Sequence, residues 1–65
     1  MELIKRFENG SYDFTMSRGI RSVGGDYYEV CRKDKITQQT MVLVTNADRI
    51  LAEHTFVKYI LIWLL

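Results

Sequence analysis

The sequence predicts a small α+β fold in which an antiparallel meander of three to four strands is covered on one face by one C-terminal helix. Two observations lead to this prediction. Turn signals separate short runs of alternating apolar and polar residues in the first two thirds of the chain, whereas the last third contains neither glycine nor proline. A chain of 65 residues has room for one hydrophobic core, so we expect residues 1–65 to form a single domain.

The first two predicted strands flank the dipeptide Asn9-Gly10. Asn-Gly favours a two-residue type I′ turn, because both central positions of that turn need a positive φ. Pairing outward from the turn places Phe7 opposite Tyr12 and Arg6 opposite Asp13. In this register one face of the hairpin is apolar, interrupted by one lysine, and consists of Leu3, Phe7, Tyr12, Phe14 and Met16.

Glycines also mark the next turn. Gly24-Gly25 is expected to fold a strand that ends near Val23 back onto residues 26–32, while Gly19, inside the preceding strand, is expected to mark a bulge or a break. A third turn over residues 33–35 leads to residues 40–45. Their nearly continuous apolar run predicts a central strand buried on both faces.

The last element is predicted to be a helix from about Ala47 to near Trp63, capped by Thr45 or Asn46, with the Asp48 carboxylate in its first turn. On a helical wheel, the apolar arc consists of Ile50, Val57, Leu61 and Leu64, extended by Ala52, Phe56, Ile60 and Trp63. Aromatic and β-branched residues in 56–65 also suit a strand. Length and the absence of a breaker favour the helix.

The composition argues against a catalytic or metal-binding site. Cys31 is the only cysteine and His54 the only histidine, so the chain has no intramolecular disulfide and no zinc-ligand cluster. Those two residues would make a nucleophile and base only if they met in space, and we expect instead a solvent-facing histidine and a packed cysteine. We therefore predict a non-enzymatic protein with no catalytic residue, cofactor or metal. One free thiol and an N-terminus without a long apolar run predict a cytoplasmic location.

The C-terminus is the least ordinary feature, because residues 59–65 are seven consecutive apolar residues. They are too few to span a membrane, and the expected polar face carries too little positive charge for a membrane interface. They can form the core, pack on a second copy, or bind another protein. A domain this short usually needs additional stabilisation from a disulfide, a metal or self-association. Because the sequence indicates neither a disulfide nor a metal, self-association remains.

We therefore predict a small protein-binding regulator or inhibitor, forming a homodimer, of the kind that phages use against host enzymes. The comparison with phage inhibitors rests only on the small size of the chain. The residues expected to contact a partner are Phe56, Tyr59, Ile62, Trp63 and Leu65 on the helix, with Tyr27, Tyr28 and Arg32 as a second patch on the sheet.

The alternative prediction is a nucleic-acid-binding sheet, because basic residues alternate with tyrosines that can stack on unpaired bases. Its residues are Arg18, Arg21, Tyr28, Arg32, Lys33 and Lys35. Acidic residues in the same region and a net charge of +1 weaken this alternative.

Overall fold

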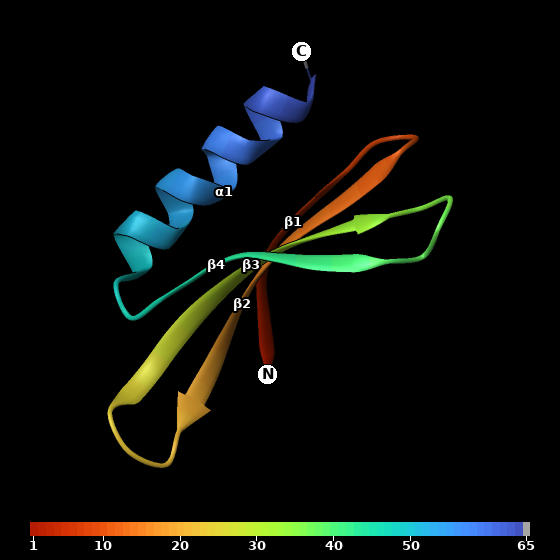
Figure 1. Cartoon of the computed structure of the whole chain (residues 1–65). Helices are drawn as coiled ribbons and strands as arrows, with labels where there is room; N and C mark the ends of the chain where they lie inside the picture. The colour runs from red at the N-terminus through yellow and green to blue at the C-terminus, as the bar shows by residue number, and fades with distance from the viewer. Residues whose placement is uncertain (65) are drawn as a thin grey trace.

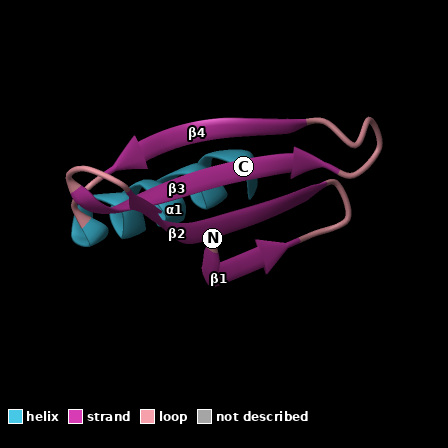
Figure 2. Ribbon diagram, turned by 90° about the horizontal axis from the view of Figure 1, so that it is seen from below, coloured by secondary structure: helices cyan, strands magenta, loops and turns pink. Residues whose placement is uncertain are grey.

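The computed structural model describes residues 1–64 and confirms the predicted fold class (Figure 1). Its elements are β1 (Glu2–Glu8), β2 (Tyr12–Arg21), β3 (Gly25–Asp34), β4 (Thr40–Asn46) and α1 (Arg49–Leu64). The strands form one antiparallel sheet in the order β1-β2-β3-β4, and α1 lies on one face of it (Figure 2). The molecule therefore has two layers, a covered sheet face beneath the helix and an open sheet face on the other side.

The first hairpin forms, but the predicted register is wrong by two residues: Phe7 pairs with Phe14, not with Tyr12. The side chain of Asn9 explains the shift. Its Oδ1 accepts hydrogen bonds from the backbone N–H groups of Ser11 and Tyr12, at 2.9 and 2.8 Å. This side-chain turn makes residues 10–11 the centre of the loop, and neither Asn9 nor the following glycine adopts a positive φ.

A bulge in β1 changes which residues of that strand reach the core. Leu3 pairs with Ser17 and Lys5 pairs with Met16, so Ile4 is the extra residue. One additional residue reverses the inside-outside alternation beyond it. Ile4 consequently packs against the core, whereas Leu3, which we predicted on the apolar face, is exposed.

The second turn forms at the predicted glycines, which both adopt a positive φ, 98° at Gly24 and 77° at Gly25. The preceding strand ends at Arg21. Gly19 was predicted to mark a bulge or a break, and this prediction is wrong, because it pairs regularly with Tyr27. The Tyr27 ring lies across the glycine, and a Cβ at position 19 would be 2.4 Å from the tyrosine Cζ.

The prediction of a buried central strand for residues 40–45 is also wrong. β4 is an edge strand of the sheet, and Met41 and Val42 are exposed. The chain passes from β4 directly into α1, so no further strand pairs with its outer edge. A second bulge, at Leu43, turns both Leu43 and Val44 toward the core cluster.

The helix begins two residues later than predicted. Asp48 is its N-cap, because Asp48 Oδ1 accepts a hydrogen bond of 2.8 Å from the N–H of Ile50 and one of 3.4 Å from that of Leu51. Asn46, one of the two predicted caps, still belongs to β4 and accepts a hydrogen bond from the Asp48 N–H. Residues 56–64 are helical, which decides between the two predicted alternatives for this segment.

The core is small and joins the two middle strands to the helix. Its fully buried members are Phe14 and Met16 of β2, Val30 of β3, and Ala52 and Phe56 of α1. Ala52 and Phe56 are four residues apart and therefore lie on the same side of the helix. Placing the smallest apolar side chain there lets the helix approach the sheet closely.

Candidate protein-binding surface

The two sides of α1 are both apolar, but only one of them contacts the sheet. Ala52 and Phe56 are buried, and Tyr59 and Ile60 are half-buried against the core. The apolar residues at the centre of the predicted arc point away from the sheet. We define the outer helix surface as Ile50, Leu51, His54, Val57, Lys58, Leu61, Ile62 and Leu64, all exposed.

The sequence-based prediction of the buried arc was therefore only half right. The helix is apolar around most of its circumference, so its own pattern does not select the buried side. The selection comes from the fit to the sheet, which takes the side bearing Ala52. Residues such as Val57 and Leu61 are left in solvent as a consequence.

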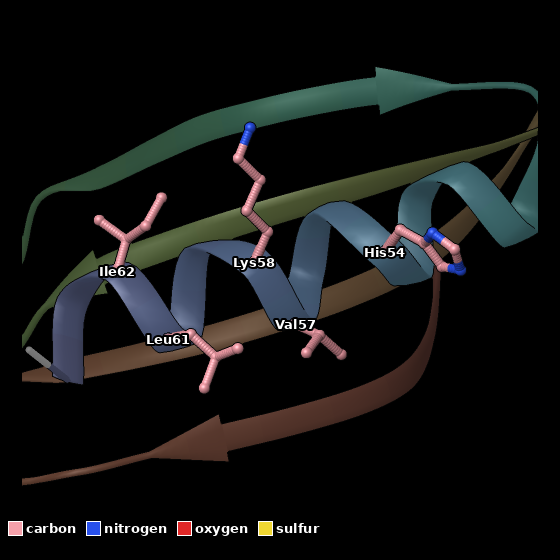
Figure 3. A pocket seen from close by; sticks show the side chains of 5 residues that line it. All are labelled: His54, Val57, Lys58, Leu61 and Ile62. Atoms are coloured by element: carbon pink, nitrogen blue, oxygen red, sulfur yellow. The ribbon is translucent and has the colours of Figure 1, made fainter.

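Figure 3 shows this surface with the sheet behind the helix. Val57 and Leu61 project toward the β1 side, and Lys58 and Ile62 project toward the β4 side. Together with His54 they line a shallow apolar hollow on the outside of the helix. The geometry offers contact area for another apolar surface and no enclosed cavity for a small substrate.

Among the predicted partner residues of the helix, two remain accessible. Ile62 is half-exposed and lies on the outer helix surface, and Trp63 is partly exposed at its margin. Phe56 is 4% exposed and belongs to the core, and Tyr59 packs against that core. Leu65 lies outside the described residues. Phe56 and Tyr59 therefore support the fold and are not included in the proposed binding surface.

Trp63 closes the end of the helix over the sheet. Its ring lies 5.2 Å from the Tyr12 ring, in a tilted arrangement. The Arg32 guanidinium lies 4.1 Å from the Trp63 ring centroid and 4.9 Å from that of Tyr12. The Arg32 guanidinium and the two rings thus contact one another pairwise, and we call this cluster the Trp63 stack. The Trp63 stack holds the last turn of α1 on the sheet.

The second predicted patch does not assemble. Tyr27 lies on the open sheet face, whereas Tyr28 and Arg32 lie on the covered face and contact the core or the Trp63 stack. Strand alternation explains the separation, because neighbouring residues point to opposite faces of a sheet. Tyr27 is the only member on the open face, where it meets the Arg21 guanidinium at 4.8 Å.

The basic residues predicted for nucleic acid are likewise divided between the two faces. Arg18 forms ion pairs with Glu2 at 3.4 Å and Asp26 at 3.6 Å, and Lys35 with Glu8 at 2.9 Å. Lys33 lies on the open face, opposite Asp13. No single basic face results from residues 1–64, and two of the five basic residues, Arg18 and Lys35, are paired with carboxylates.

Cys31 and His54 do not meet. The register places Cys31 on the open sheet face, whereas His54 lies on the outer side of α1, so the whole molecule separates them. Burial, followed by a hydrogen bond to the nearby Glu29 carboxylate, raises the pKa of Cys31 to about 11. The thiol donates to Glu29 Oε1 at 3.3 Å. It is protonated at neutral pH and is a poor nucleophile.

Residues 1–64 contain no group of three or more potential metal ligands. Within the same residues, no helix has the length and apolarity needed to cross a membrane.

The open sheet face is an ordinary solvent-facing surface. Arg6 there binds both carboxylate oxygens of Asp13, at 3.0 and 2.9 Å, and the neighbouring positions are largely polar or charged. This face is therefore mainly polar, and we take the outer helix surface as the candidate site.

Comparison of the chain with protein-family models, curated proteins and solved structures gives no match. The functional argument therefore depends on the geometry of this molecule.

Proposed function

We propose that this protein is a non-enzymatic protein-binding module that acts through the outer helix surface. One observation carries the proposal. Six apolar side chains on this surface are each 50% to 66% exposed, namely Ile50, Leu51, Val57, Leu61, Ile62 and Leu64. A surface helix normally places charged and polar residues on its solvent side. A contiguous apolar stripe there is typical of an interaction site.

The rest of the molecule supports this assignment. The open sheet face carries the ion pairs and polar groups expected of a solvated surface, with Leu3 and Val42 as isolated exposed apolar residues. The six exposed apolar side chains of α1, in contrast, lie together on one side of one helix. A module that offers apolar contact and no catalytic group acts by covering a surface of another protein chain. This mode of action suits a regulator or an inhibitor.

Leu61 is the expected anchor of the surface. It lies in the middle of the stripe, between Val57 and Leu64 along the helix, and lines the apolar hollow (Figure 3). Residues near the centre of an interface contribute most of the binding energy, while those at its margin exclude water. Trp63, at the margin, is already engaged by the Tyr12 and Arg32 stack.

Site-specific photo-crosslinking tests the proposal. A photoreactive amino acid at position 61 should give covalent protein adducts in cells of the native source, whereas the same amino acid at Lys33, on the open sheet face, should give few. Adducts to a second copy and adducts to another protein both support the binding role. Equal adduct formation at the two positions, or none at position 61, would contradict it.

Salt dependence separates this proposal from the nucleic-acid alternative. An apolar interface changes little between low and high salt, whereas phosphate-driven binding weakens steeply. A gel shift with single-stranded and duplex oligonucleotides should show no retarded band at low salt. A retarded band that disappears at high salt would favour the alternative instead.

A further inference from the structure

We infer that the outer helix surface is occupied by a second copy of this chain, with the two α1 helices packed side by side and parallel. The inference rests on the proposed function, because it names the partner of the same surface. Three features of α1 carry it: the spacing of its outward residues, the charges that flank them, and the position of the sheet.

The outward residues have the spacing of a coiled-coil seam. Ile50, His54, Val57, Leu61 and Leu64 follow one another at intervals of four, three, four and three residues. This is the a and d pattern of a heptad, which keeps one stripe facing a partner helix. Four of the five positions are apolar, and all five side chains are exposed.

The sheet leaves this seam accessible. The residues that contact the sheet, such as Ala52 and Phe56, lie on the opposite side of α1. In Figure 3 the middle strands pass behind the helix, β1 and β4 lie to either side of it, and no strand crosses in front of it. Two copies can therefore approach helix to helix, with their sheets outside, in four layers of sheet, helix, helix and sheet.

The flanking charges select the parallel direction. Glu53 and Lys58 lie on opposite sides of the seam: Glu53 is 3.8 Å from Lys5 of β1, and Lys58 projects toward β4. In heptad terms they occupy g and e positions, five residues apart. A parallel pair brings Glu53 opposite the partner's Lys58, and the two-fold axis repeats this contact. Within residues 1–64, Lys58 has no ion pair in its own chain.

The antiparallel direction is disfavoured by the same residues. If two helices crossed antiparallel about Val57, the Lys58 side chains of the two copies would lie near each other at the centre of the interface. Like charges at this distance repel. Glu53 would then lie beside apolar residues of the other helix instead of a positive charge.

His54 gives the parallel pair its register. It occupies an a position, so the two imidazoles of a parallel dimer lie in the same layer of the seam. A single polar residue in a seam specifies alignment and lowers stability. A helix of 16 residues is about 24 Å long, so the interface is at the low end of the usual size range. We therefore expect a dissociation constant on the order of micromolar.

Sedimentation velocity over a range of protein concentrations tests the dimer. The wild-type chain should change from monomer to dimer as concentration rises, and Leu61→Glu should remain monomeric with an unchanged circular dichroism spectrum. The matched control is Val42→Glu, an exposed edge-strand position outside the seam, which should dimerise like wild type. A folded wild-type chain that stays monomeric at every concentration overturns the inference.

Charge exchange tests the direction. Lys58→Glu should weaken the parallel dimer at least severalfold, because it faces Glu53 with a second carboxylate. The double variant Glu53→Lys with Lys58→Glu should recover the affinity. An antiparallel dimer would change little in response to Lys58→Glu alone, since both copies carry the change and a close pair of glutamates replaces the close pair of lysines. Unchanged or tighter association of this variant therefore overturns the parallel arrangement.

Disulfide trapping provides a second test of direction. In a Cys31→Ser background, His54→Cys should form an intermolecular disulfide on mild oxidation, because the two positions share a layer of the seam. Leu51→Cys, at the edge of the surface, should react more slowly. Equal rates at positions 51 and 54 would count against the parallel seam. If the chain is monomeric yet crosslinks through position 61 to a different protein, the inference fails while the proposed binding function stands.

Discussion

The open sheet face and the outer helix surface differ in polarity. The open sheet face carries a bidentate Arg6–Asp13 pair, and its single cysteine is hydrogen-bonded to Glu29. The outer helix surface carries six exposed apolar side chains, and the ion pairs nearest to it among the described residues are those of Glu53 with Lys5 and Arg49 at its margin. Both surfaces belong to the same small fold, but only the sheet face has the mainly polar character of a solvated surface.

An element on the surface of a fold has to bury apolar side chains against the core and also present polar side chains to solvent, and the sheet and the helix differ in whether they do both. In the sheet, strand alternation accomplishes both, with apolar residues such as Phe14 and Met16 on one side and polar residues between them. In α1 the periodicity accomplishes only the first. The solvent side of α1 remains apolar and exposed, and the following predictions test how far this contrast extends.

The largest expected effect is on the inner side of α1. Phe56→Ala removes a buried ring from a core of five residues and should lower the free energy of unfolding by about 3–5 kcal/mol. This is comparable to the whole stability of a domain of this size, so the variant should be largely unfolded. Phe56→Leu should remain folded, with a loss of about 1 kcal/mol.

The matched change on the outer side is Leu61→Ala. Measured by urea unfolding at a concentration where the chain is monomeric, it should alter the free energy of unfolding by no more than about 0.5 kcal/mol. Similar losses for Leu61→Ala and Phe56→Leu would remove the distinction between the two sides of the helix.

Thiol reactivity tests how far the fold shields Cys31 on the open sheet face. Because the pKa of Cys31 is raised to about 11, less of it is thiolate at pH 8 than in an unfolded chain. Alkylation by iodoacetamide should therefore be roughly ten- to hundredfold slower in the folded protein than in urea. Glu29→Gln removes a negative charge and should lower the pKa and speed the reaction. An equal alkylation rate in both states would show that the fold does not shield the Cys31 thiol.

Capping of the helix should have a smaller effect. Asp48→Ala removes the acceptor for the first helical N–H groups and should cost about 1 kcal/mol of stability. Thr45→Ala is the control, since this residue lies in β4 and is not the cap. Urea unfolding of both variants checks the prediction, which would be wrong if the threonine change cost as much.

The smallest expected effect concerns the Arg6–Asp13 pair on the open sheet face. A double-mutant cycle should give a coupling of roughly 0.2–1 kcal/mol at low salt, falling as salt rises. A larger coupling that does not change with salt would mean that the Arg6–Asp13 pair contributes more to stability than an exposed ion pair normally does.

Much of the fold is predictable because it depends on local chemistry. The glycine turn at residues 24–25 requires positive φ, and α1 follows from a long segment without breakers. Residues 3 and 4 were misplaced because a bulge is one extra residue, and no composition signal marks it. Gly19 was misread because its role comes from Tyr27, a residue on the neighbouring strand.

For the candidate site, the sequence showed an excess of apolar residues at the C-terminus but not which of them are exposed. The spacing of Ile50, Val57 and Leu61 is visible in the sequence. The spacing alone does not say whether those residues face the sheet or the solvent. Phe56 was assigned to the surface for the same reason, although it lies in the core.

The sequence by itself determined that a meander of three to four strands is followed by an apolar helix, because turn chemistry, alternation and the lack of helix breakers act within a few residues. Only the tertiary structure decided the pairing register, the edge position of β4 and the side of α1 that is buried. Those choices depend on how whole elements fit together. A helix apolar on both sides offers two nearly equal stripes, and the close approach at Ala52 selects the inner one.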